Sequence, residues 1–425
     1  MTSWAAPGWI FGGLLFGLSA AITEVSSSGH EALWSQVPPG NTPAEVPQFV
    51  AVTFDDNFGL ALPGSVGGVG AIVKYYAGKH NPAGEGNARN FDGAPIRASF
   101  FDTSVYMVDS TERVLKGKKG EDQKGRNRAA WKSALAAGHE IADHTVNHLN
   151  GGAAVISKQD CCRRRDWSVA QWSAEIASCR TTLADPRFRL AAEDVIGFRA
   201  PYLSYNDNLF TALQNLSFAY DSSLPNCFDD EEDGTNCSWP YALSEGSPDA
   251  DSFARKIKRS IPESLPSIQK HLGLWELPIT TLIVPPDSDA AKYHFRTGLR
   301  ERIAARAPFP YPSVYDTRAG KITGLDYTLL IDAGVTGEEM RAILEYNLDL
   351  HLAGNHSPLI FVAHAHLYAF STPTDNPDTP TNADRQTRWK GLTDFITYAL
   401  TKPDVRVVAT EDVLAWMRAK VGLKL

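Results

Sequence analysis

Short apolar runs rich in β-branched and aromatic residues recur along this chain, and a polar stretch with helical periodicity follows most of them. The runs cover residues 49–54, 96–101, 140–142, 195–198, 219–221, 274–279, 359–363 and 405–409. Helix-like segments cover residues 169–183, 207–216, 337–352, 388–400 and 410–421. Alternating strands and helices favour a parallel sheet. We therefore predict an α/β fold, a distorted (β/α) barrel of seven or eight parallel strands with long loop insertions.

Residues 285–325 interrupt this alternation, because prolines and aromatic residues replace the apolar and helical pattern. We interpret the stretch at about 285–325 as an insertion over one face of the barrel, within a single catalytic domain at 47–425. No appended binding module is expected after the last strand and helix.

The N-terminus differs in composition from the rest of the chain. Residues 1–23 carry no charged side chain, and residues 9–21 are mostly apolar or small. This is too short for a membrane-spanning helix but typical of a signal peptide, although the usual basic start is missing. We predict a signal peptide at 1–23, a leader at 24–46, a secreted or periplasmic protein and no stable membrane insertion. The formal net charge of −8 argues against nucleic-acid binding. No oligomeric state is indicated.

The five cysteines lack the spacing of a metal site. Cys227 and Cys237 bracket a short acidic loop, which favours a disulfide between them and an oxidising compartment. Cys179 could pair with Cys161 or Cys162, which would leave one thiol over.

Polar residues with catalytic potential follow several of the predicted strands. In a (β/α) barrel the carboxyl ends of the strands share one face, where active sites lie. Residues distant in sequence would therefore meet there. They are Asp55, Asp56, His144, His148, Arg199, Tyr202 and His364.

Two histidines and an aspartate among them could bind one metal ion. His144 and His148 are four residues apart, so a helical turn would place both imidazoles on one face. With Asp56 as oxygen ligand, positions stay open for water and substrate, as catalytic zinc requires. The alternative for Asp55 and Asp56 is a strand-end turn or helix N-cap. Adjacent carboxylates repel each other, however, unless a cation and an arginine separate their roles.

Three of these stretches resemble motifs of a known family. The sequences TFDD at 53–56, HTVNH at 144–148 and RAPY at 199–202 look like the first three motifs of the polysaccharide deacetylases of carbohydrate esterase family 4. Further stretches, GFRAPYL, YDSS, WPY and PLIFVAHAHL, are similar to those of arthropod-type chitin deacetylases. The resemblance covers most of the chain after about residue 46.

The resemblance implies a role for each site residue. Asp55 matches the catalytic base, Arg199 the residue that holds this base, and His364 the general acid. The backbone N–H of Tyr202 would face the oxyanion. The matches to the metal triad are Asp56, His144 and His148. It also implies one divalent metal ion, for which we expect zinc, and hydrolysis of N-acetyl groups in chitin-like chains of N-acetylglucosamine, giving acetate and a free amino sugar.

The chain departs from the family pattern in two places. Asn57 stands where glycine or alanine is usual. The fourth motif, an Asp-x-x-x-Trp that tunes the acid histidine, is absent from its expected place, where residues 274–278 read LWELP. Asp412 and Trp416 have the required spacing, but they follow His364 and lie in the predicted terminal helix. What orients His364 therefore stays open, and His366 remains a rival for the acid role.

Other functions would use similar residues. The alternatives are deacetylation of peptidoglycan or of an O-acetylated glycan, a small-molecule amidohydrolase of the allantoinase-like branch, and a catalytically silent carbohydrate-binding relative. Chain-length preference could come from aromatic residues that stack on sugar rings. The candidates are Trp239, Tyr241, Phe309, Tyr311 and Tyr315.

Overall fold

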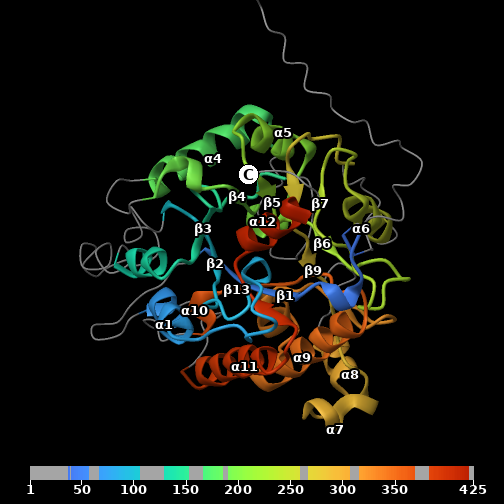
Figure 1. Ribbon diagram of the computed structural model, residues 1–425. Coiled ribbons are helices and arrows are strands. Elements are labelled where there is room, and N and C mark those ends of the chain that lie inside the picture. Colours follow the sequence, from blue (N-terminus) through green and yellow to red (C-terminus); the bar gives the residue numbers. More distant parts are fainter. Residues whose placement is uncertain are drawn as a thin grey trace, which may run out of the picture.

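The structure is a computed structural model that describes residues 37–38, 40–56, 67–105, 129–152, 166–184, 190–258, 267–306, 315–368 and 382–420. Its central feature is a curled sheet of nine strands, in the order β13-β1-β2-β3-β4-β5-β8-β7 with β14 beside β1 (Figure 1). The strands are β1 (Gln48–Asp56), β2 (Ser99–Asp102), β3 (Glu140–Asp143), β4 (Gly197–Phe198), β5 (Tyr220–Asp221), β7 (Tyr241–Ala242), β8 (Trp275–Glu276), β13 (Leu359–His364) and β14 (Val405–Val407).

Strand β1 pairs with three strands, β13, β14 and β2, and almost all of its side chains are buried. Burial on both faces is typical of a parallel strand covered by helices on one side and by the barrel interior on the other. Every strand pair in the sheet is parallel except β7 with β8. The register aligns Asp55 with His364 of β13 and Asp56 with Asp102 of β2. Polar strand ends therefore meet at one face.

Irregular segments close the gap between the two sides of the sheet. A separate parallel pair is formed by β6 (Pro225–Asn226) and β9 (Ile279–Thr280). The Ile360 backbone N–H donates to Thr280 Oγ1 at 2.9 Å, and Leu325 forms a parallel bridge with Val362 of β13. The predicted distorted (β/α) barrel is thus confirmed.

Helices surround the sheet, with α4 and α5 along one side and α9 and α11 along another (Figure 1). The N-cap Ser168 and its capping box start α4 at the predicted residue. Apolar side chains from these helices and from the outer sheet face form the larger core, and a smaller core fills the barrel interior. The helices are α1 (Gly67–Tyr76), α4 (Val169–Leu183), α5 (Asp207–Asn215), α6 (Pro248–Lys258), α9 (Gly337–Ala353), α10 (Ala365–Tyr368), α11 (Asn382–Leu400) and α12 (Thr410–Lys420).

The region of the predicted insertion carries its own small elements. An antiparallel sheet in the order β10-β12-β11 anchors it to the barrel. The elements are β10 (Leu282–Ile283), α7 (Ala290–Tyr293), α8 (Leu299–Arg306), β11 (Tyr315–Asp316) and β12 (Lys321–Ile322). A π-helical turn, η8 (Tyr327–Asp332), follows β12 after residues 323–326. The short 3-10 turns are η7 (Asp287–Asp289) in this region and, elsewhere, η2 (Pro43–Glu45), η3 (Ala88–Asn90), η5 (Ala192–Asp194) and η6 (Pro201–Leu203).

The cysteine predictions have different outcomes. The disulfide between Cys227 and Cys237 is present. The pairing expected for Cys179 is wrong, because this residue is a free, buried thiol on α4 whose Sγ lies 3.4 Å from the Asp102 carbonyl oxygen. Cys161, Cys162 and the predicted signal peptide lie outside the described residues. Within the described ranges, no helix is both long and apolar enough to span a membrane.

Candidate active site

Asp56 and two histidines form a compact group of donor atoms at the carboxyl ends of the strands. One ligand atom from each of Asp56, His144 and His148 lies within 4.8 Å of the others. His148 Nε2 is 3.1 Å and His144 Nε2 is 3.6 Å from Asp56 Oδ1. Two imidazoles and one carboxylate are the donor set of catalytic zinc sites with open positions. The residues present therefore fit a single divalent cation.

Local electrostatics gives Asp56 and His144 the protonation that metal binding requires. Burial lowers the pKa of His144 to about 4, so the ring is neutral at neutral pH. Burial opposes ionisation of Asp56, but His148 and His144 outweigh it and lower the pKa of Asp56 to about 2. His144 Nδ1 lies 2.7 Å from the Arg199 carbonyl oxygen and donates to it, which leaves Nε2 to face the cation position.

The two histidines are not on a helical turn, so that part of the prediction is wrong. Residues 144–148 form a loop in which Thr145 and His148 have φ angles of 67° and 51°. Asp56 and Tyr202 are also left-handed, with φ of 62° and 60°. Non-glycine residues adopt this conformation at an energetic cost, and such residues gather at functional sites. The loop still brings the rings to 5.1 Å between centroids.

Arg199 binds the carboxylate of Asp55. Its Nη1 donates to Asp55 Oδ1 at 2.6 Å and to Thr53 Oγ1 at 2.7 Å. Its Nε and Nη2 donate to the carbonyl oxygen and hydroxyl of Ser222, and its guanidinium lies 4.0 Å from the Phe101 ring centroid. Arg199 is fully buried and Asp55 almost so. A fixed buried arginine orients the neighbouring carboxylate.

Tyr202 lies beside the metal ligands, in the turn η6 that follows β4. Its ring centroid is 4.6 Å from that of His148. The left-handed conformation of Tyr202 turns the chain sharply after Pro201. The tyrosine thus lies beside His148, while its assigned role in binding an oxyanion stays a prediction.

Asp326 orients His364, and no sequence motif predicted this residue. Asp326 Oδ1 lies 2.7 Å from His364 Nδ1, and its Oδ2 accepts the His364 backbone N–H at 2.7 Å. The carboxylate is fully buried. It reaches His364 because residues 323–326 run beside β13, where Val362 donates its N–H to the Gly324 carbonyl oxygen. Asp326 was hard to recognise in the sequence, because it follows the predicted insertion. The residue four positions after it is a leucine, where the Asp-x-x-x-Trp motif has tryptophan.

Protonation distinguishes His364 from its rival His366. Burial opposes the charge on His364, but Asp326, with smaller contributions from Asp56 and Asp55, raises its pKa to about 9. Burial and the neighbouring His364 lower the pKa of His366 to about 4. His364 is thus cationic at neutral pH, and its Nε2 lies 4.0 Å from Asp56 Oδ2. His366 is neutral and lies 3.2 Å from the Tyr327 hydroxyl.

Asp412 and Trp416, which have the spacing of the fourth motif, lie away from His364. Both lie on α12, where Asp412 forms an ion pair with Arg97 and Trp416 packs against Phe49 of the barrel interior. Neither contributes to the group around His364.

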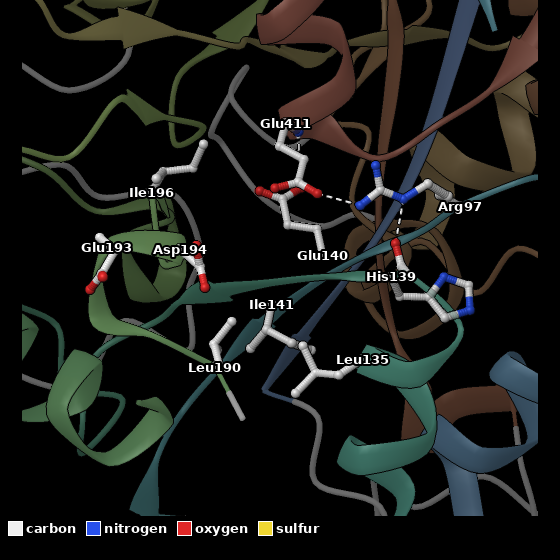
Figure 2. A pocket seen from close by; sticks show the side chains of 11 residues that line it. Arg97, Leu135, His139, Glu140, Ile141, Leu190, Glu193, Asp194, Ile196 and Glu411 are labelled. Carbon is white, nitrogen blue, oxygen red and sulfur yellow. Dashed lines mark hydrogen bonds and ion pairs between the residues drawn. The ribbon is translucent and has the colours of Figure 1, made fainter. Parts of the chain in front are cut away.

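A cavity of about 370 Å³ lies near Asp412, at the amino ends of β3 and β4 rather than at their carboxyl ends. Figure 2 shows the carboxylates of Glu140 and Glu411 side by side at its edge, with Arg97 bound to Glu411. Burial and the neighbouring Glu140 raise the pKa of Glu411 to about 7. The cavity is therefore separate from the candidate active site and holds none of its residues.

The aromatic residues proposed to stack on sugar rings are not exposed in the described part of the chain. Trp239, Tyr241 and Tyr315 are buried, so the prediction is wrong for these three. Trp239 stacks on Trp416 inside the barrel, and its indole N–H donates to the Asn355 carbonyl oxygen at 3.0 Å. Phe309 and Tyr311 lie outside the described residues.

A comparison with protein families matches residues 93–220 to the polysaccharide deacetylase family. Over this stretch the chain is similar to members of that family. The matched stretch contains His144, His148, Arg199 and Tyr202. Among curated proteins, Chitin deacetylase 1 of Bombyx mori is 27% identical over 191 residues, which is 44% of this chain. The alignment spans only 27% of the length of the Bombyx protein.

Solved structures of polysaccharide deacetylases and of an allantoinase are also similar to this chain. A presumed polysaccharide deacetylase from Mycobacterium smegmatis matches with a TM-score of 0.44 and 16% identity, covering 91% of this chain and 95% of its own. An allantoinase matches with a TM-score of 0.43 and 12% identity, covering 89% and 94%. A family 4 carbohydrate esterase from Streptomyces lividans, with acetate bound, gives a TM-score of 0.26 at 14% identity over 49% and 73%.

Proposed function

We propose that this chain is a metal-dependent hydrolase that removes N-acetyl groups from chitin-like chains containing N-acetylglucosamine. The observation that carries the proposal is the convergence of three groups at one face of the barrel. These are the donor set of Asp56, His144 and His148, the Arg199-held carboxylate of Asp55, and the cationic His364. The family match and the similarity to a chitin deacetylase support this substrate class.

The metal ligands in this proposal are Asp56, His144 and His148, and the proposed ion is Zn²⁺. When bound, the cation would polarise the acyl oxygen and acidify a water molecule. We propose that Asp55 accepts the proton of this water as its oxygen attacks the acetamide carbonyl. Because Arg199 occupies Asp55 Oδ1, the other oxygen is left for the proton.

His364 completes the reaction as general acid. Its Nε2 proton moves to the leaving nitrogen as the carbon–nitrogen bond breaks, which releases acetate and a free amine. Asp326 accepts the other ring proton and so fixes the orientation of the acid. By resemblance, the Tyr202 backbone N–H stabilises the oxyanion, a contribution of roughly 3 kcal/mol for one well-placed donor.

The limits of the catalytic domain and the cellular location of the protein are also proposals. We propose one catalytic domain at 47–425 and export by way of residues 1–23. The Cys227–Cys237 disulfide supports an oxidising compartment.

Product analysis on a panel of substrates tests the activity. We expect the purified protein with Zn²⁺ to release acetate from an N-acetylglucosamine tetramer and to form one free amine for each acetate. The panel includes the monomer, acetylated xylan, peptidoglycan and allantoin, and protein treated with a chelator is the control. Turnover of only the xylan esters or only allantoin would contradict the proposed substrate class.

The pH dependence tests the acid. In the folded protein the pKa of His364 is about 9, above the value near 6.5 of an unfolded histidine. The charged His364 therefore stabilises the folded state fully below pH 6.5, and this contribution is lost as the pH rises through about 9. Asp326→Asn removes the charge that raises this pKa, so the alkaline limb of kcat/KM should move down by about one to three pH units. The measurement is a pH–rate profile of both proteins.

His366→Gln is the matched control for Asp326→Asn, because His366 lies next to His364 but is neutral. Its profile should keep the alkaline limb of the parent. A limb that moves with His366→Gln and stays with Asp326→Asn would assign the acid role to His366 instead.

A further inference from the structure

The second metal-ligating histidine is held differently from the first. His144 is fully enclosed, and the Arg199 carbonyl oxygen fixes its ring. The His148 side chain is 17% exposed, and the ring packs against Tyr202. Its position depends on a left-handed backbone, in which the His148 N–H donates to Thr145 Oγ1 at 3.2 Å. Keeping His148 in place therefore requires that the loop itself be held.

One carboxylate outside the site holds this loop at the residue before His148. Glu175 Oε2 accepts the backbone N–H of Asn147 at 3.1 Å, and its Oε1 accepts the Asn147 side-chain amide at 2.8 Å. Both oxygens are thus used on a single residue. Such a two-point contact fixes the orientation of Asn147 as well as its position, which one hydrogen bond cannot do.

Glu175 is itself on a rigid support. It lies near the middle of α4, which the Ser168 capping box starts. The helix is anchored to the sheet by buried side chains on its inner face. These are Trp172, Ile176, Cys179 and Leu183. A group carried by an anchored helix positions its partner more firmly than one carried by a loop.

We propose that Glu175 is a positioning residue for the metal centre, which acts through Asn147 to keep the His148 imidazole in its ligating place. This inference rests on the metal binding proposed above. Groups that orient metal ligands typically change metal affinity by about 10- to 100-fold when they are removed. Glu175 touches no ligand atom, so its effect would be on the arrangement of the loop and not on the chemistry of the donors.

The test is the Zn²⁺ dissociation constant of the full chain, measured by competition with a chromophoric chelator. Glu175→Gln keeps the size of the side chain but turns an N–H donor toward the Asn147 donors. We expect it to raise the dissociation constant by about 10-fold. The thermal midpoint of the metal-free variant should stay close to that of the metal-free parent. A contact that only stabilised the fold would lower this midpoint and leave the affinity for Zn²⁺ unchanged. A dissociation constant within twofold of the parent would overturn the proposal.

A double-mutant cycle tests the route through Asn147. If Glu175 acts through this residue, Glu175→Ala should weaken Zn²⁺ binding less in an Asn147→Ala background than in the parent. Equal effects in both backgrounds would mean that the Asn147 side-chain amide does not carry the effect, which contradicts the proposed two-point contact. Glu193→Gln is the charge control, since it removes an exposed carboxylate at the far end of the barrel.

The parent protein separates failure of this inference from failure of the proposed function. If the parent binds no Zn²⁺, the metal-dependent function fails. If the parent binds Zn²⁺ and Glu175→Gln binds it equally well, only the positioning role fails.

Discussion

Replacing Asp55 by asparagine is expected to reduce turnover by roughly 10²- to 10⁴-fold, the usual contribution of a general base, while Zn²⁺ stays bound. The amide keeps the shape of the side chain and can still accept from Arg199, but it cannot take a proton from water. The fold should survive because the buried Arg199 retains its bonds to Thr53 and Ser222. Steady-state rates of acetate release and metal content per chain are the two measurements.

Asp56→Asn is the informative comparison, since the two residues are neighbours and the substitutions are chemically identical. Asp56 Oδ1 lies within 3.6 Å of a ring nitrogen of both His144 and His148, whereas Asp55 Oδ1 faces Arg199. Asp56→Asn should therefore weaken metal binding as well as turnover. Equal metal loss in both variants would show that the roles of the pair are misassigned.

Removing a histidine ligand should have an effect of similar size, through the metal itself. The parent should carry about one divalent cation per chain, and His144→Ala should lose both the cation and measurable activity, because two donors rarely suffice for a zinc site. Elemental analysis of dialysed protein gives the metal content. His80→Ala is the control, since His80 is exposed, and it should keep both properties. An active parent preparation without metal would contradict the prediction.

The parallel strands made much of this site predictable. Asp55 and Asp56 end a strand, Arg199 follows another, and His364 ends a third, so the common direction of the strands brings them to one face. The pattern of apolar runs was enough to place these residues, because each of them ends or directly follows a buried strand. The helix at 169–183 was predictable for a similar local reason, since its cap and its apolar face are both visible in the sequence.

Contacts between distant irregular segments could not be predicted in the same way. Asp326 reaches His364 because residues before it run beside β13 without forming a regular strand, and no period in the sequence signals such a path. The spacing of His144 and His148 fits a helical turn, yet the chain takes left-handed conformations there that tertiary contacts impose. Trp239 was a candidate for stacking on sugar rings, but it fills the barrel interior.

Asp326 links the protonation of His364 to the region at about 285–325. Asp326 sets the charge of His364, yet it is attached to the end of the region at about 285–325, which β10, β11 and β12 anchor to the barrel. A change in the length or path of this region would therefore also move the carboxylate that keeps His364 cationic, and with it the pH range over which His364 can donate a proton.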